Sequence, residues 1–131
     1  MTVELSSEVR DALLLEADQA HPRECCGILL GGTEAIDGLV SARNVHSLPE
    51  THFEIDPQAL VDSHRNARSG GPLVIGYYHS HPNGLAEPSA TDRASAARDG
   101  SIWAIVARGK VSLWRDGDDG FAPLPYRIRE R

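Results

Sequence analysis

Two histidines, His79 and His81, stand one residue apart behind the apolar run Leu73-Val74-Ile75. Side chains alternate between the two faces of a β-strand, so a strand here puts both imidazoles on one face, close enough to share a metal ion. A helix does not bring residues at this spacing together. Asp92 follows eleven residues after His81, inside 88–92, where a helix is expected to start. Two imidazoles and one carboxylate can hold a catalytic zinc ion and leave a position for water, so the spacing predicts a metal site suited to hydrolysis.

Hydrolysis at such a site also needs a general base that is not itself a metal ligand. Glu24 is one candidate, because it precedes the apolar run 25–30, and a strand there would bring Glu24 to the metal if it lies beside 73–81. Glu54 and Glu87 are alternatives that the residue pattern alone leaves open.

The overall composition restricts the class of protein. The 131 residues, 40% hydrophobic and 24% charged, predict one globular domain over 1–131. A net charge of −6 argues against nucleic acid or an anionic membrane as a partner. No apolar run approaches the ~18 residues of a membrane span, and the N-terminus lacks a signal-peptide pattern, so we expect a cytoplasmic protein.

The only cysteines, Cys25 and Cys26, are adjacent, so we expect two buried thiols rather than a disulfide.

Capping residues, chain breakers and apolar periodicity predict the elements that position these side chains. Helices are expected from Ser6 or Ser7 to about Ala20, from Asp56-Pro57 to Ser69-Gly70, and from Ser89 to about Asp99. Strands are expected at 2–5, 25–30, 34–45, 73–81, 102–107, 111–115 and, as a final edge strand, 121–129. The predicted fold class is therefore α+β, a single domain with a mixed β-sheet flanked by about three helices.

Five residues resemble a known family signature in their order and spacing. The stretch His79-Ser80-His81-Pro82, followed by Ser89 and Asp92 and preceded far upstream by Glu24 in Arg23-Glu24-Cys25-Cys26-Gly27, looks like the signature of the JAMM (MPN+) metallopeptidase family. The resemblance covers nearly the whole chain and implies a curved MPN/JAMM-like sheet with a cytidine-deaminase-like core. It also implies that His79, His81 and Asp92 bind one Zn2+ ion per chain. Glu24 would be the general base that takes a proton from a zinc-bound water, and Ser89 would hydrogen-bond the oxyanion.

The resemblance also implies a substrate class. The family cleaves peptide or isopeptide bonds at the C-termini of ubiquitin-like proteins. The chain looks like the small prokaryotic members, because 44–55 and 92–103 are too short for the two insertions that clasp ubiquitin in the large deubiquitinating members. We therefore expect a ubiquitin-like or sulfur-carrier protein as substrate, with an extended tail that adds to a sheet edge bordered by 46–54 and 82–88. The physiological substrate, the choice between peptide and isopeptide bond, and a homodimer stay open.

Simpler interpretations of the same residues remain beside this one. The two histidines could be satisfied by neighbours at a strand end, Ser89 and Asp92 also fit a capping box, and Glu24 could be a surface carboxylate. A second functional class is a non-catalytic MPN-type scaffold, although such proteins usually lose one of the five positions. A third class is a metallohydrolase of small peptides or amides. The sequence assigns no role to His46 and His52, for which a surface position is expected.

Overall fold

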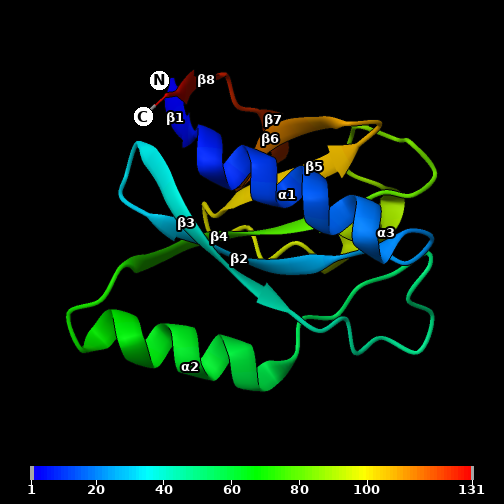
Figure 1. Ribbon diagram of the computed structural model, residues 1–131, viewed down its shortest axis with the longest axis horizontal. Helices are drawn as coiled ribbons and strands as arrows, with labels where there is room; N and C mark the ends of the chain where they lie inside the picture. The colour runs from blue at the N-terminus through cyan, green and yellow to red at the C-terminus, as the bar shows by residue number, and fades with distance from the viewer. Residues whose placement is uncertain (1, 131) are drawn as a thin grey trace.

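An eight-stranded mixed β-sheet runs through the computed structural model, which describes residues 2–130 (Figure 1). Its strand order is β7-β6-β5-β4-β2-β3-β1-β8, so the first and last strands of the chain are neighbours. The predicted α+β class, a mixed and curved sheet with three helices, is confirmed. In chain order the elements are β1 (Val3–Ser6), α1 (Ser7–Ala20), β2 (Cys26–Gly31), β3 (Ala35–Ala42), α2 (Pro57–Arg68), β4 (Leu73–Ser80), α3 (Ala90–Ser95), β5 (Ile102–Ala107), β6 (Lys110–Gly117), β7 (Gly120–Pro123) and β8 (Tyr126–Arg129).

Side-chain caps begin the two long helices at the predicted positions. The hydroxyl of Ser6 accepts a hydrogen bond from the amide of Val9 at 3.1 Å and starts α1. The carboxylate of Asp56 accepts one from the amide of Gln58 at 3.1 Å, and Pro57 follows as the first residue of α2. Over residues 2–130, no helix combines the length and apolar character needed to cross a membrane.

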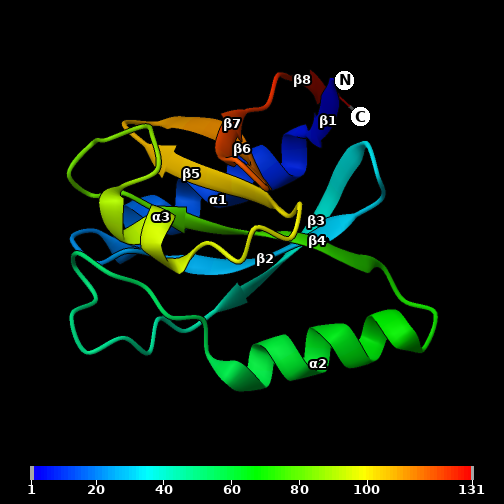
Figure 2. The same ribbon diagram turned by 180° about the vertical axis from the view of Figure 1, so that it is seen from behind.

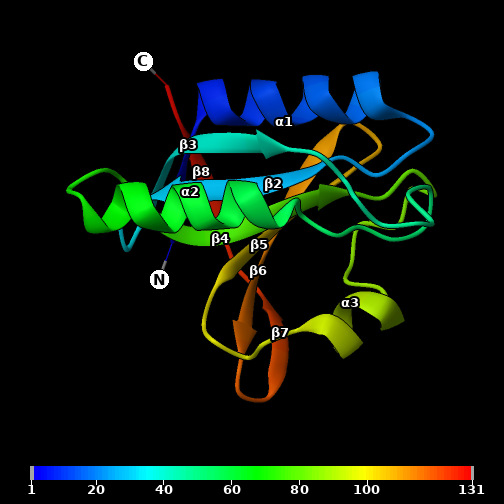
Figure 3. The ribbon, with the colours of Figure 1, turned by 90° about the horizontal axis from the view of Figure 1, so that it is seen from below.

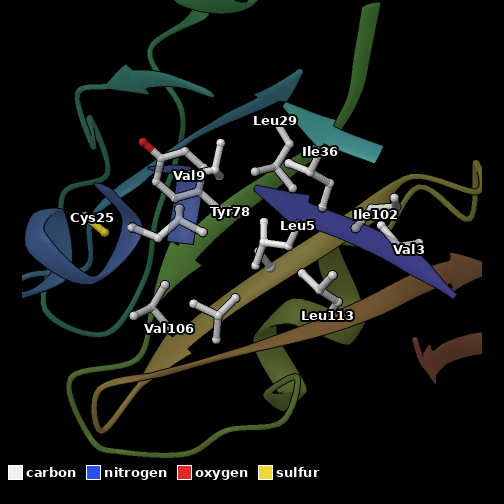
Figure 4. Packing of buried hydrophobic residues seen from close by; sticks show 13 residues of the cluster. Val3, Leu5, Val9, Cys25, Leu29, Ile36, Tyr78, Ile102, Val106 and Leu113 are labelled. Atoms are coloured by element: carbon white, nitrogen blue, oxygen red, sulfur yellow. The ribbon is translucent and has the colours of Figure 1, made fainter. Parts of the chain in front are cut away.

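The sheet carries a separate apolar cluster on each face. Figures 1 and 2, taken from opposite sides, place α1 in front of the sheet in the first view and α3 in front in the second. Val9 and Leu13 of α1 pack against one face. Figure 4 shows this larger cluster, which includes Val3, Leu5, Cys25, Leu29, Ile36, Tyr78, Ile102, Val106 and Leu113. The smaller cluster joins Cys26, Ile28 and Ile55 to side chains such as Leu60 of α2 and Tyr77 of β4.

The two cysteines follow the alternation of the strand that they begin. Cys25 packs in the larger cluster and Cys26 in the smaller one, and both are buried free thiols. The expectation of two buried thiols without a disulfide is confirmed.

The pairing of β2 with β4 brings together two segments that are distant in the sequence. These central strands lie side by side (Figure 3). They run antiparallel, with Cys26 opposite His79. Continuing that register by two residues places Glu24 opposite His81. Because alternate residues share a face and opposite residues lie on the same face, Glu24 and both histidines belong to one face of the sheet. This is the side that carries the smaller cluster with Cys26.

Helix α3 is shorter than the predicted helix 89–99, because the chain after Ser95 is bound to β6. The amide of Arg98, which has a positive φ of 56°, donates to Oδ2 of Asp116 at 3.2 Å. The amide of Gly100 donates to the backbone carbonyl of Asp116 at 2.7 Å. Asp116 is buried in β6. These bonds to a distant strand use backbone groups that a longer helix would need, so the helix ends after Ser95.

The predicted final strand 121–129 is in fact two strands at opposite edges of the sheet. β7 pairs antiparallel with β6, whereas β8 pairs parallel with β1. Pro123 is the last residue of β7, and Pro125 lies between β7 and β8. Neither proline has an amide to donate to a central ladder. The edge position was predicted correctly, but the division into two strands was not.

Candidate metal centre

Three side chains converge where β4 ends. The Nε2 atoms of His79 and His81 lie 2.9 Å apart, and Oδ2 of Asp92 lies 3.1 Å from the first and 3.0 Å from the second. All three residues are buried, His79 completely. His79 belongs to β4, His81 follows it by one residue, and Asp92 lies in the first turn of α3. The structure thus brings together the three residues that could hold a metal ion.

The spacing of these atoms fits a metal ion. Zinc–ligand bonds of about 2.0–2.2 Å in a tetrahedron place ligand atoms about 3.3 Å apart, close to the observed 2.9–3.1 Å. Nδ1 of His81 lies 2.7 Å from the carbonyl oxygen of Leu85, so we assign the proton to Nδ1, which leaves the Nε2 lone pair facing the site. Burial lowers the pKa of His79 and so favours the neutral imidazole that a ligand must present.

The capping box of α3 orients the carboxylate of Asp92. Oγ of Ser89 accepts a hydrogen bond from the amide of Asp92 at 3.0 Å, and Oδ2 of Asp92 accepts one from the amide of Ser89 at 2.9 Å. Burial alone would raise the pKa of Asp92, but the close approach of the His79 and His81 rings and the hydrogen bond from the Ser89 amide outweigh burial and hold that pKa far below its ordinary range. Asp92 is therefore charged and fixed in orientation, as an oxygen ligand of a metal ion must be. The same two residues can thus cap the helix and serve a metal site.

Two aromatic side chains that the sequence pattern did not indicate enclose His79. The ring of Phe53 stacks on the imidazole with centroids 4.2 Å apart, and Trp103 meets it edge-on at 5.7 Å. These rings fix the imidazole plane and cover one side of the site. Nδ1 of His79 has no hydrogen-bond partner among residues 2–130. Trp103 lies opposite Tyr77 in the β4–β5 pairing, so strand alternation could have indicated its face, whereas Phe53 lies in a loop without periodicity.

Glu24 is buried beside this group rather than exposed at the surface. Glu24 interacts electrostatically with both His81 and Asp92, and the residue is only 7% exposed. Burial raises the pKa of Glu24 to about 7; His81 lowers it in part, and Asp92 raises it further. A carboxyl group with a pKa near neutrality can both accept and donate a proton at physiological pH. The alternatives Glu54 and Glu87 are both exposed.

Two cavities have both Glu24 and one of the three converging residues in their walls. The smaller, of about 110 Å³, is also lined by His81 and Ser89. The larger, of about 350 Å³, lies between the loop before α2, α3 and β5. Of the segments expected to border a groove, Thr51–Glu54 line the larger cavity, and Pro82 and Asn83 line the smaller one. The larger cavity is lined by Glu24, Thr51, His52, Phe53, Glu54, Ile55, Pro57, Leu60, Tyr77, Thr91, Asp92, Ser95 and Trp103.

The remaining histidines lie outside the ligand group. His46 and His52 are partly buried and stack on each other with ring centroids 4.7 Å apart. They belong to the loop that leads to the larger cavity, so the expected surface position is only partly correct. His21 and His64 are exposed.

The chain is similar to known proteins over most of its length. The family described as prokaryotic homologs of the JAB domain matches residues 6–117. A desampylase from Haloferax volcanii is 33% identical over 131 residues, which cover 95% of this chain and 94% of the relative. A "probable TtuB-protein conjugate cleaving protease" from Thermus thermophilus is 36% identical over 84 residues, 60% of this chain and 56% of that protein. A solved structure described as JAMM, a metalloprotease-like zinc site in the proteasome and signalosome, has a TM-score of 0.59 at 21% identity and covers 97% and 99% of the two chains.

These similarities agree with the motif and with the fold. The family match includes Glu24, both histidines, Ser89 and Asp92. The solved structure shares the fold of the chain, and the two relatives carry the names of enzymes. The expected resemblance is therefore confirmed. The chain belongs to the prokaryotic homologs of the JAB domain, the small prokaryotic branch of the JAMM (MPN+) family, and is a hydrolytic enzyme of the JAMM type.

Proposed function

We propose that the chain is a zinc-dependent metallopeptidase that hydrolyses a peptide or isopeptide bond at the C-terminus of a ubiquitin-like or sulfur-carrier protein. The observation that carries the proposal is the meeting of His79, His81 and Asp92, with Glu24 in the wall of the cavities beside them. This arrangement pairs a three-residue ligand set, which leaves one position open in a catalytic site, with a carboxyl group outside that set.

The donor set supports zinc, with one ion per chain. Two neutral imidazole nitrogens and one carboxylate oxygen are typical donors for catalytic zinc. When bound there, zinc would polarise the scissile carbonyl and lower the pKa of water to about 7. His79, His81 and Asp92 would hold the ion, and the Leu85 carbonyl and the Ser89 amide would keep His81 and Asp92 in their orientations.

Glu24 would act first as a general base and then as a general acid. Its pKa of about 7 allows its carboxylate to accept a proton from the attacking water and to pass that proton to the leaving amine. No described hydrogen bond within residues 2–130 reaches this carboxylate, and the residue lines both cavities, so its oxygens can accept a proton there.

Ser89 would donate a hydrogen bond to the oxyanion of the tetrahedral intermediate. A hydroxyl group has one proton and two lone pairs, and Oγ of Ser89 uses a lone pair to accept the amide of Asp92. The proton therefore remains for the substrate. Because Ser89 lines the smaller cavity with Glu24 and His81, it is near the space where hydrolysis would occur.

An extended substrate tail would find a free backbone edge beside the ligands. The carbonyl of Glu54 and the amide of Asp56 bond the segment 43–45, at 2.9 and 3.1 Å. Backbone groups alternate in direction along an extended segment, so those of Phe53 and Ile55 point away from 43–45. Both residues line the larger cavity. This edge supports strand addition by a flexible C-terminal tail, the mode expected for an extended peptide.

The relatives support the substrate class. One is a desampylase that the chain matches over nearly its full length, and the other is named for cleavage of a protein conjugate. In this chain only 14 residues, 43–56, separate β3 from α2. Such a short connection leaves the larger cavity open, which suits the thin tail of a carrier protein.

The proposal is tested with a sulfur-carrier or ubiquitin-like protein that carries extra residues after its terminal Gly-Gly. The zinc-loaded protein is incubated with several such substrates, with and without a chelator, and the products are weighed by mass spectrometry. We expect release of the extra residues, abolished by the chelator and restored by added zinc. Cleavage of short peptides alone would instead favour a small-peptide metallohydrolase, and zinc binding without any cleavage would favour a scaffold.

A further inference from the structure

We infer that Asn44 is a positioning residue for Glu24: its side-chain amide holds the loop 44–54 against the backbone of Glu24. The inference rests on the proposed function, because it concerns the residue proposed as the base. Asn44 lies two residues after the end of β3 and is partly buried. None of its described hydrogen bonds involves the side chain of His79, His81 or Asp92. Its effect on hydrolysis would therefore pass through Glu24.

The donor side of the Asn44 amide joins the loop to Glu24. Nδ2 donates to the carbonyl of Glu24 at 3.1 Å and to the carbonyl of His52 at 3.0 Å, with a longer contact to the carbonyl of Pro49 at 3.4 Å. An amide nitrogen has two hydrogens, so the two short bonds use both. One side chain thus connects Glu24, two positions before β2, to two separate points of the loop.

The acceptor side of the same amide closes the loop on itself. Oδ1 of Asn44 accepts hydrogen bonds from the amides of His46 and Glu54, each at 3.1 Å. The donors are eight residues apart in the chain, so the oxygen joins the beginning of the loop to its end. Asparagine is suited to this position because it presents two donors and an acceptor on a short side chain.

The loop in turn holds the amide of Glu24. That amide donates to the carbonyl of Pro49 at 2.7 Å, while its carbonyl accepts from Asn44. The next residue is held by β4, since the amide of Cys25 donates to Oγ of Ser80 at 2.8 Å and its carbonyl accepts the amide of Ser80 at 3.1 Å. Both backbone groups of Glu24 therefore depend on the loop, whereas those of Cys25 depend on the strand that carries the histidines.

No described hydrogen bond within residues 2–130 fixes the Glu24 carboxylate. Its position is set by the backbone from which it extends and by the walls of the cavities. A displacement of about 1 Å at a catalytic group can lower a rate about 100-fold. Loss of the Asn44 amide should therefore displace the base without removing the metal.

The test compares Asn44→Ala with Glu24→Gln, with the double variant and with Ser47→Ala, an exposed change in the same loop. For each we measure kcat and KM on the extended carrier substrate, zinc per chain, and backbone amide exchange. We expect Asn44→Ala to bind zinc normally, to lower kcat about 10- to 100-fold with little change in KM, and to exchange the Glu24 amide faster. In the Glu24→Gln background the same change should alter kcat less than about twofold, because the base through which Asn44 acts is gone. Ser47→Ala should match the wild type.

Three results would overturn the inference: wild-type kcat in Asn44→Ala, loss of zinc from it, or an equal fold-loss in both backgrounds. If Asn44→Ala does not fold, Asn44→Asp replaces it. That variant keeps the acceptor for His46 and Glu54 and puts a carboxylate oxygen, which cannot donate, in place of the amide nitrogen. The same outcomes apply. Failure of the proposed mechanism is distinguishable, because Glu24→Gln would then itself retain full activity. An inactive Glu24→Gln together with a fully active Asn44→Ala would refute the role of Asn44 alone.

Discussion

Removing the charge of Glu24 should stabilise the metal-free protein at alkaline pH. Burial raises the pKa of Glu24 from 4.5 to about 7, so the folded protein holds this proton more tightly than the unfolded chain. The stability that this provides is fully present below about pH 4.5 and is lost as the pH rises through about 7. Above that pH the folded protein keeps a buried charge that the unfolded chain exposes to water. Glu24→Gln removes this penalty.

The size of the effect follows from the pKa. A rise from 4.5 to about 7 corresponds to roughly 3 kcal/mol. Water in the cavities lined by Glu24 screens its charge, which reduces the figure to about 1–2 kcal/mol. For a chain of this size, 1 kcal/mol moves the unfolding midpoint by about 3–5 °C. We therefore expect Glu24→Gln to melt roughly 3–10 °C above the wild type at pH 8, and the difference to shrink to less than about a third of that at pH 4.5.

The assay is thermal unfolding of chelator-treated protein, followed by circular dichroism at pH 4.5 and pH 8. Other titrating groups are common to both proteins, so their effects largely cancel in the difference. Glu87→Gln, at an exposed position, is the matched control and should melt with the wild type at both pH values. The reasoning that burial of this carboxyl group lowers stability would be refuted by either of two results at pH 8. One is an equal unfolding midpoint for wild type and Glu24→Gln, and the other is a lower midpoint for the variant.

The other predictions concern the ligands and the cap. Elemental analysis should show that His79→Ala and Asp92→Ala each lose the bound zinc, because each variant leaves only two ligands. His64→Ala, a change at an exposed position, should retain the zinc. Zinc at the wild-type level in His79→Ala or Asp92→Ala would remove that residue from the ligand set. Ser89→Ala should lower stability by about 1 kcal/mol through loss of the cap, and kcat by about 10²–10³-fold through loss of the oxyanion donor. Ser89→Thr should keep both hydroxyl functions, and a stability loss in Ser89→Ala without any change in kcat would make Ser89 only a cap.

The convergence of His79, His81 and Asp92 could be predicted from the sequence because short-range geometry determines it. His79 and His81 face the same way since they are two residues apart at the end of one strand. Asp92 is fixed relative to Ser89 by a capping box that spans one helical turn. The register of β4 against its neighbours was not needed for this prediction, so a local pattern was sufficient.

Glu24 could not be placed by local pattern, because it reaches the histidines through pairing between strands far apart in sequence. The bond between Cys25 and Ser80 spans 55 residues, and no periodicity in 24–31 specifies β4 as the partner. The family resemblance selected Glu24 as the expected base. The residue pattern by itself left Glu54 and Glu87 equally open.

The parts that sequence patterns missed depend on loops and long-range partners. Phe53 stacks on His79 from a loop without periodicity. Asn44 joins segments on both sides of that loop. The early end of α3 depends on bonds from Asp116, which lies 18 residues beyond Arg98. Each requires the folded chain to bring the partner into place, so neither propensity nor spacing could indicate it.

The rate of cleavage per bound zinc in Glu24→Gln tests the central claim most directly. Wild type and variant, each loaded with zinc, are incubated with the same carrier protein extended beyond Gly-Gly, and zinc content and product are measured in the same samples. We expect wild-type zinc content in the variant and a rate about 10²–10⁴-fold lower, the contribution of a general acid–base group. A wild-type rate per bound zinc would contradict the role of Glu24 as the base, and loss of zinc would make Glu24 a ligand instead.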